Sequence, residues 1–214
     1  MDGRAFLKLP FSLPFTRGEL RTLRDLNTPA KIQRWIESLP YHHARTAWSP
    51  RRVLRERTAH CLEGAIFATA ALRVHGFPPL IWDLEAVFDD DHVLAIFKVD
   101  GHWGAIAKSN YAGLRYREPV YRSLRELAMS YFNDYFNLRG QRTLRAFSKP
   151  VNLAHFDRRN WMTTEEELWY IPEHLVELPH TPLFSARTAR RLTRLDARAQ
   201  AAGKTGRQEK SRSR

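Results

Sequence analysis

Three short apolar segments separated by polar turn residues lie near the middle of the chain. They predict strands at 80–86, 92–99 and 102–109. Asp100-Gly101, between the last two segments, is a strong signal for a two-residue hairpin turn. With that turn the numbers of paired residues sum to 201, so His92 would face Ser109 across the hairpin.

The segment before this hairpin is apolar on nearly all sides. Residues 61–72 are rich in small and apolar side chains, which is typical of a central, buried helix. Gly76 is a natural end for the helix, and Pro78 and Pro79 prevent its continuation. The pattern predicts an α+β fold in which this helix packs on an antiparallel sheet.

Spacing and capping residues predict elements on either side. Residues 26–39 show helical spacing, with Thr28 as the N-cap and Pro29 as the first helical residue. A further strand is expected within 144–153.

Two capping-box spacings predict helix starts in the second half of the chain. Ser123 with Glu126 marks one start, and Thr164 with Glu167 marks a short turn or helix that Pro172 interrupts.

Charge divides the chain unevenly. The formal net charge is +12, and residues 185–214 hold ten Lys or Arg and two Asp or Glu, a net of +8. We therefore expect an irregular N-terminal arm at 1–17, one domain at 18–184, and a basic tail at 185–214 that is disordered.

The chain has a single cysteine, Cys61, which excludes an internal disulfide and a zinc site with two cysteines. No apolar run approaches the length of a membrane helix, and the first residues lack a signal-peptide pattern. These features predict a cytoplasmic protein without membrane insertion, and no cofactor or metal is expected.

Cys61 at the head of the buried helix and His92 at the start of a strand are the residues with the most chemical potential. A helix N-terminus lowers the pKa of a thiol, and a neighbouring imidazole lowers it further and acts as a base. A polar group that orients the imidazole would complete the set.

Three stretches of the sequence resemble the transglutaminase-like superfamily of papain-type cysteine enzymes. They are His60-Cys61-Leu62-Glu63-Gly64-Ala65, then Ala71-Leu72-Arg73-Val74-His75-Gly76-Phe77-Pro78-Pro79, then His92 followed by Asp100-Gly101-His102-Trp103. The resemblance covers about a quarter of the chain. It implies a papain-like fold and a cysteine hydrolase, peptidase or acyltransferase that acts on an amide or ester bond through a thioester. Cys61 would be the nucleophile and His92 the base.

The third catalytic residue departs from the family pattern, because the usual aspartate position is Ala107. Strand pairing offers Ser109, and a one-residue bulge would bring in Asn110 instead. Asp83 and Asp91 are further options.

Several alternatives stay open. A catalytically inactive papain-fold module that binds a peptide or protein partner would use the same cleft, and Ala107 favours it. Cys61 could be a buried filler and His92 an ordinary strand residue. Zinc on Cys61 with His60, His92 and His102 lacks ligand-pair spacing. The substrate would be a peptide, a protein or a small amide or ester, and the basic tail also permits nucleic-acid binding.

Overall fold

The strands and helices are described from a computed structural model, which defines residues 13–209. Its helices are α1 (Arg17–Asp25), α2 (Pro29–Glu37), α3 (Pro50–Glu56), α4 (Cys61–Val74), α5 (Leu124–Met129), α6 (Tyr170–Glu177), α7 (Ala186–Ala189) and α8 (Ala197–Gly203), with a 3₁₀ segment at Leu153–Arg159. Its strands are β1 (Leu80–Ala86), β2 (His92–Val99), β3 (His102–Ile106), β4 (Arg117–Tyr121), β5 (Leu144–Phe147), β6 (Val151–Asn152) and β7 (Thr181–Pro182).

The strands form one antiparallel sheet in the order β4-β3-β2-β1-β5-β7, with β6 also paired to β1. The α+β prediction with an antiparallel sheet is confirmed. The hairpin register is also confirmed, because Ala95 pairs with Ile106 and Val99 with His102, each summing to 201. Gly101 has φ +82°, as the two-residue turn requires.

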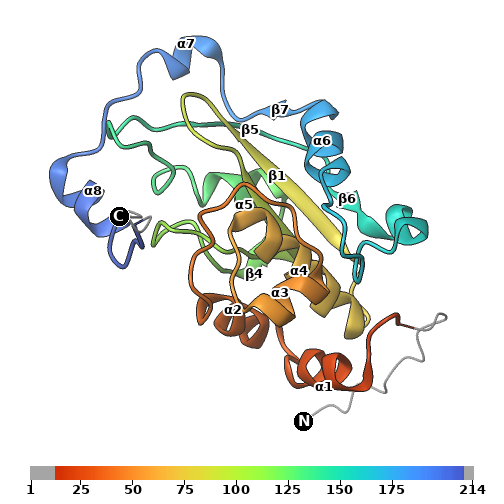
Figure 1. The fold of residues 1–214 in the computed structure, drawn as a ribbon. Helices are drawn as coiled ribbons and strands as arrows, with labels where there is room; N and C mark the ends of the chain where they lie inside the picture. Colours follow the sequence, from red (N-terminus) through yellow and green to blue (C-terminus); the bar gives the residue numbers. More distant parts are fainter. Residues whose placement is uncertain (1–12, 210–214) are drawn as a thin grey trace.

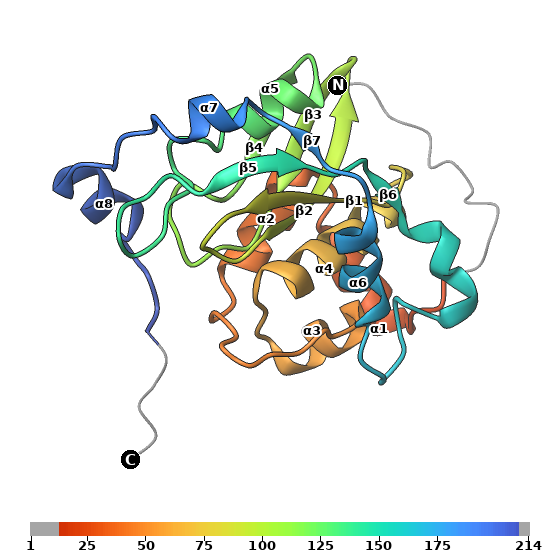
Figure 2. The same ribbon diagram turned by 90° about the horizontal axis from the view of Figure 1, so that it is seen from above.

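The sheet has a core on each face. Figure 2 shows α1–α4 and α6 on one side and α5 with α7 on the other. On the α4 side, Val93, Ala95 and Phe97 of β2 pack against the helices. On the α5 side, Leu94 and Ile96 of the same strand join the second core. This alternation follows from the two-residue period of a strand.

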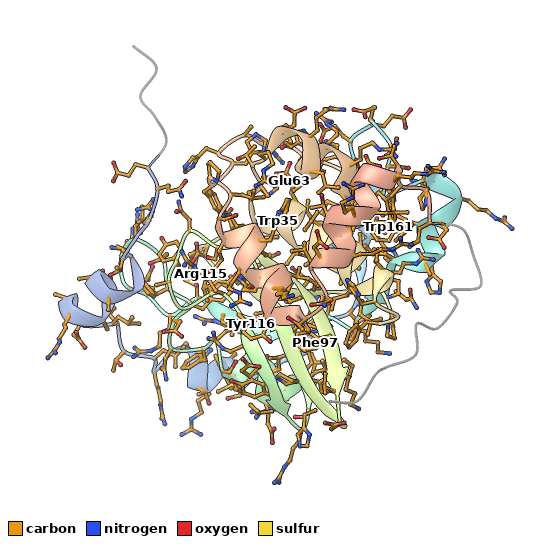
Figure 3. The ribbon with its side chains drawn as sticks, turned by 90° about the horizontal axis from the view of Figure 1, so that it is seen from below. Trp35, Glu63, Phe97, Arg115, Tyr116 and Trp161 are labelled. Atoms are coloured by element: carbon orange, nitrogen blue, oxygen red, sulfur yellow. The ribbon has the colours of Figure 1, made fainter. Side chains whose placement is uncertain are left out.

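Helix α4 is buried along nearly its whole length, as its composition predicts. Trp35 of α2 stacks on Phe67 of α4 with ring centroids 4.3 Å apart. In Figure 3, Trp35 and Trp161 lie in this helical layer, and Tyr116 lies against Phe97 at the sheet. The helix is therefore a fixed platform for Cys61 at its first position.

Several predicted boundaries differ from those observed. Strand β3 ends at Ile106 rather than Ser109, and the predicted strand 144–153 is split into β5 and β6 by Lys149-Pro150. The capping-box spacing at Thr164 marks a turn and not a helix: the Thr164 hydroxyl accepts the N–H of Glu166 (3.1 Å), and α6 begins at Tyr170. Pro172 sits in its first turn, where a proline is tolerated.

The segment after Ser185 differs from the disordered tail expected from its composition. Through residue 209 it contains α7 and α8 and contacts the body of the protein. Leu195 donates its backbone N–H to Gly140, and Gly203 accepts from the N–H of Ala112. Residues 1–12 of the expected N-terminal arm and 210–214 of the expected tail lie outside the described residues. Among 13–209, no helix is long and apolar enough to cross a membrane.

Candidate functional site

The start of α4 is fixed by Glu63, which is fully buried. Its carboxylate accepts the backbone N–H of His60 (3.2 Å), the hydroxyl of Thr46 (2.6 Å) and a contact from Nδ1 of His42 (3.0 Å). Figure 3 shows Glu63 within the helical layer. An acid in the first turn also favours the positive end of the helix dipole. The network holds the loop before α4 against the residue that precedes Cys61.

Cys61 is half-buried, and its surroundings disfavour the thiolate. Burial raises the pKa of the thiol to about 11. Backbone hydrogen bonds from Leu62 and Val93 oppose this shift, while the nearby charge of Asp90 adds to it. Desolvation therefore outweighs the helix N-terminus, and the sulfur is a neutral thiol near pH 7.

His92 lies on the other face of the sheet from α4. It pairs with Leu84 at the edge of the second core, and its Nε2 is 2.9 Å from the carbonyl oxygen of Leu114. The ring of Tyr135 contacts it edge-on at 6.3 Å. Its neighbour Val93, not His92, faces the helix and Cys61.

The expected juxtaposition of Cys61 and His92 is therefore wrong, because the period of β2 turns the imidazole away from the thiol. Burial lowers the pKa of His92 to about 4, so the ring is neutral near pH 7. Nε2 must carry the proton in order to donate to the Leu114 carbonyl.

Ser109 does not face His92, because β3 ends before reaching it. The amide side chain of Gln33 takes over both backbone groups of Ala107: the Ala107 N–H donates to Oε1 (3.0 Å) and Nε2 donates to the Ala107 carbonyl (2.8 Å). The chain then leaves the sheet, and the Ser109 hydroxyl accepts the N–H of Tyr111 (3.0 Å).

Asn110 holds the C-terminal segment instead of an imidazole. Its Nδ2 donates to the backbone carbonyl of Gln208 (2.7 Å), and its Oδ1 accepts the backbone N–H of the same residue (2.7 Å). The Gln208 side chain accepts the backbone N–H of Tyr41 (2.7 Å). Composition alone gave no signal for Gln208, because the contact spans 98 residues of sequence.

Comparison with known proteins adds no assignment. No family model matches the chain, and a search of curated proteins finds no significant match.

Tyr41 connects the Gln208 contact to Cys61. Burial raises the pKa of Tyr41 well above its usual range, and the nearby backbone of Cys61 opposes this shift. In a cysteine enzyme the backbone N–H of the nucleophile normally faces the developing oxyanion. The Tyr41 side chain therefore lies near the backbone of Cys61.

A buried His–Asp pair lies on the α4 side of the sheet. Nε2 of His180 is 3.0 Å from Oδ2 of Asp83, and Nδ1 is 2.8 Å from the carbonyl of Leu178. Burial raises the pKa of Asp83 to about 6. Both ring nitrogens have acceptors, so neither is open to take a proton from a thiol. Asp83, one of the alternative orienting residues, therefore pairs with His180.

Asp91, the other alternative, accepts the backbone N–H of Ala86 (2.8 Å) in the β1–β2 connection. This contact closes the turn, and it gives Asp91 a structural role there.

His42, His60 and Glu63 bring potential metal-ligand atoms within 4.8 Å of one another. These atoms already have protein partners, since Nε2 of His60 is 2.8 Å from the Thr46 carbonyl and the Glu63 carboxylate has four hydrogen-bond partners. A cation would have to break this network. We interpret the cluster as the support of the α4 start.

Proposed function

We propose that the protein is a non-catalytic, papain-fold module that binds an extended peptide beside Cys61. The two hydrogen bonds from the Asn110 side chain to one residue of backbone are the observation that carries this proposal. A side-chain amide that offers a donor and an acceptor imitates the edge of a β-strand, which recognises backbone irrespective of sequence. The C-terminal segment of the chain is the peptide bound there now.

The resemblance to transglutaminase-like proteins supports the fold part of the proposal. A buried helix that begins at the cysteine and packs on an antiparallel sheet is the arrangement the resemblance implies. Within that arrangement, Ala107 at the usual acid position favours binding over catalysis.

Hydrolysis or acyl transfer through Cys61 is less well supported than binding. Such chemistry needs a thiolate, a nearby base and a free oxyanion donor. The neutral thiol and the orientation of His92 into the second core argue against the first two of these requirements.

Peptide binding in trans tests the proposal. The probe is a fluorescein-labelled peptide with the sequence of residues 203–210, and the protein is the full chain carrying Gln208→Pro. Proline has no backbone N–H to donate to Oδ1 of Asn110. The chain's own C-terminal segment should therefore leave the site. Because a tethered segment competes at an effective concentration near millimolar, we expect at least about tenfold tighter binding than to the wild type in fluorescence anisotropy.

Two controls make the result specific. Adding Asn110→Ala to the Gln208→Pro chain should abolish the gain, and a peptide with an N-methylated glutamine should bind weakly to both chains. Equal affinity of the wild type, the single variant and the double variant would refute the peptide site. Cleavage or covalent capture of the peptide, seen by mass spectrometry, would favour the enzyme instead.

A further inference from the structure

Four arginines converge on a cavity at the end of the sheet, and all four lie outside the stretches that carry the resemblance. The cavity has a volume of about 490 Å³. Arg142 and Arg145 come from the body of the domain, and Arg190 and Arg194 come from the segment after Ser185. Figure 1 shows that this segment, between α7 and α8, runs along the end of the sheet where β1 turns into β2.

The positive charge of this cavity is not compensated by the residues that form it. No acidic side chain lines it, and within residues 13–209 none of the four arginines is in an ion pair. Arg142 donates to the backbone carbonyl of Thr193, and Arg145 donates to the carbonyls of Arg142 and Leu144. Like charges held together in this way favour an anion.

An aromatic side chain stands at the rim of the same cavity. Phe88, in the β1–β2 turn, is 84% exposed and has φ +59°, in the left-handed region that favours glycine. A large apolar residue in that conformation is costly and is not repaid by burial. Contact between this ring and a ligand would account for its exposure in this conformation.

A second cavity lies on the other side of Phe88. Its volume is about 520 Å³, and Tyr111 and Arg139 are among its lining residues. Asp89 is among the lining residues of this second cavity, and its carboxylate accepts the hydroxyl of Thr143 (2.9 Å), which lines the first cavity. The first cavity is therefore the stronger anion site, and the second can receive an uncharged base or sugar.

We propose that single-stranded nucleic acid binds across Phe88, with its phosphates in the arginine-lined cavity and a base stacked on the ring. Alternating stacking platforms and positive grooves are the usual basis of sequence-tolerant binding to single strands. The arginine-lined cavity shares no residue with the peptide contact between Asn110 and Gln208. The segment after Ser185, held by backbone contacts such as Leu195 N–H to the Gly140 carbonyl, contributes two of the arginines of the cavity.

Fluorescence anisotropy of the full chain with labelled oligo(dT)15 tests this proposal. Arg190→Gln/Arg194→Gln should weaken binding at least about tenfold at 50 mM salt. The slope of log affinity against log salt should become shallower by about 1.4, since each phosphate contact on a single strand accounts for about 0.7. Phe88→Ala should weaken binding about tenfold with little change in that slope.

The matched control is Arg187→Gln/Arg191→Gln, which removes the same charge from the same segment outside the cavity lining. This control variant should weaken binding of the strand less than about threefold. Equal losses in the two double variants would show that general charge drives binding and would overturn the site. The site would also be overturned if the wild type did not bind the strand, or if Phe88→Ala had no effect on affinity. Heparin that competes as well as an unlabelled strand of equal charge would overturn it too.

Discussion

At the scale of single residues, His92 shows how burial decides chemistry. Its ring is enclosed in the second core, where it donates one hydrogen bond to a carbonyl and stays neutral. A buried neutral histidine contributes to the pH dependence of folding, because the unfolded chain binds a proton more readily.

The stability of the fold should fall on acidification because of His92. Its pKa is about 4 when folded and near 6.5 when unfolded, so the unfolded state gains a proton first as pH falls through this window. We expect the free energy of unfolding to fall by up to about 3 kcal/mol between pH 6.5 and 4 from this group alone. Urea titrations at several pH values measure it.

His92→Gln keeps a donor for the Leu114 carbonyl but cannot titrate, so its stability should depend less on pH in this window. His155→Gln, at an exposed histidine, should behave like the wild type. A His92→Gln chain with the full acid-induced loss would contradict the neutral, buried ring.

At the scale of elements, the packing of α4 depends on Gly64, a residue that the helical pattern of the sequence does not explain. A Cβ on Gly64 would lie 2.5 Å from Cβ of Lys108, which is buried against the helix. Nζ of Lys108 donates to the carbonyl of Leu39 (2.5 Å), and burial lowers its pKa to about 8. The close approach lets the chain after β3 pack directly on α4.

Gly64→Ala should therefore destabilise the protein despite the better helix propensity of alanine. We expect a loss of about 1–3 kcal/mol in the free energy of unfolding, from the overlap with Lys108. Gly18→Ala in α1 is the matched control, because nothing lies within 4 Å of its added Cβ. That change should be neutral or stabilise by up to about 1 kcal/mol. The reverse order in denaturant titrations would refute the packing.

The elements were predictable where local signals decide them. β1 and β2 match their predicted bounds, and Thr28 caps α2 with Pro29 as its first residue. Predictions failed where a distant side chain replaces a local partner. Gln33 ends β3 by satisfying Ala107, as described above.

The capping-box spacing at Thr164 gives a turn without a helix for the same reason. The carboxylate of Glu167 accepts the N–H of Ala47 and pairs with Arg52, 115 residues away, instead of capping a helix. A spacing within four residues carries no information about such partners.

At the scale of the whole molecule, the sequence indicated candidate reactive residues but not how they are arranged. The single thiol and His92 were identifiable by type and order, yet the face of β2 on which the imidazole lies depends on packing with Tyr135. Charge counting located the basic segment, whereas its arginines meet Arg142 only after folding. Gln208 at Asn110 likewise needed the complete fold.

The central claim is that the thiol of Cys61 is not activated by an imidazole, and the pH dependence of its alkylation tests this most directly. Cys61 is the sole cysteine, so iodoacetamide labelling followed by mass spectrometry reports on it alone. With a pKa of about 11, the rate should rise about tenfold per pH unit from pH 7 to 10, equally in the wild type and in His92→Gln. A rate that levels off between pH 6 and 8, and falls in His92→Gln, would contradict the account.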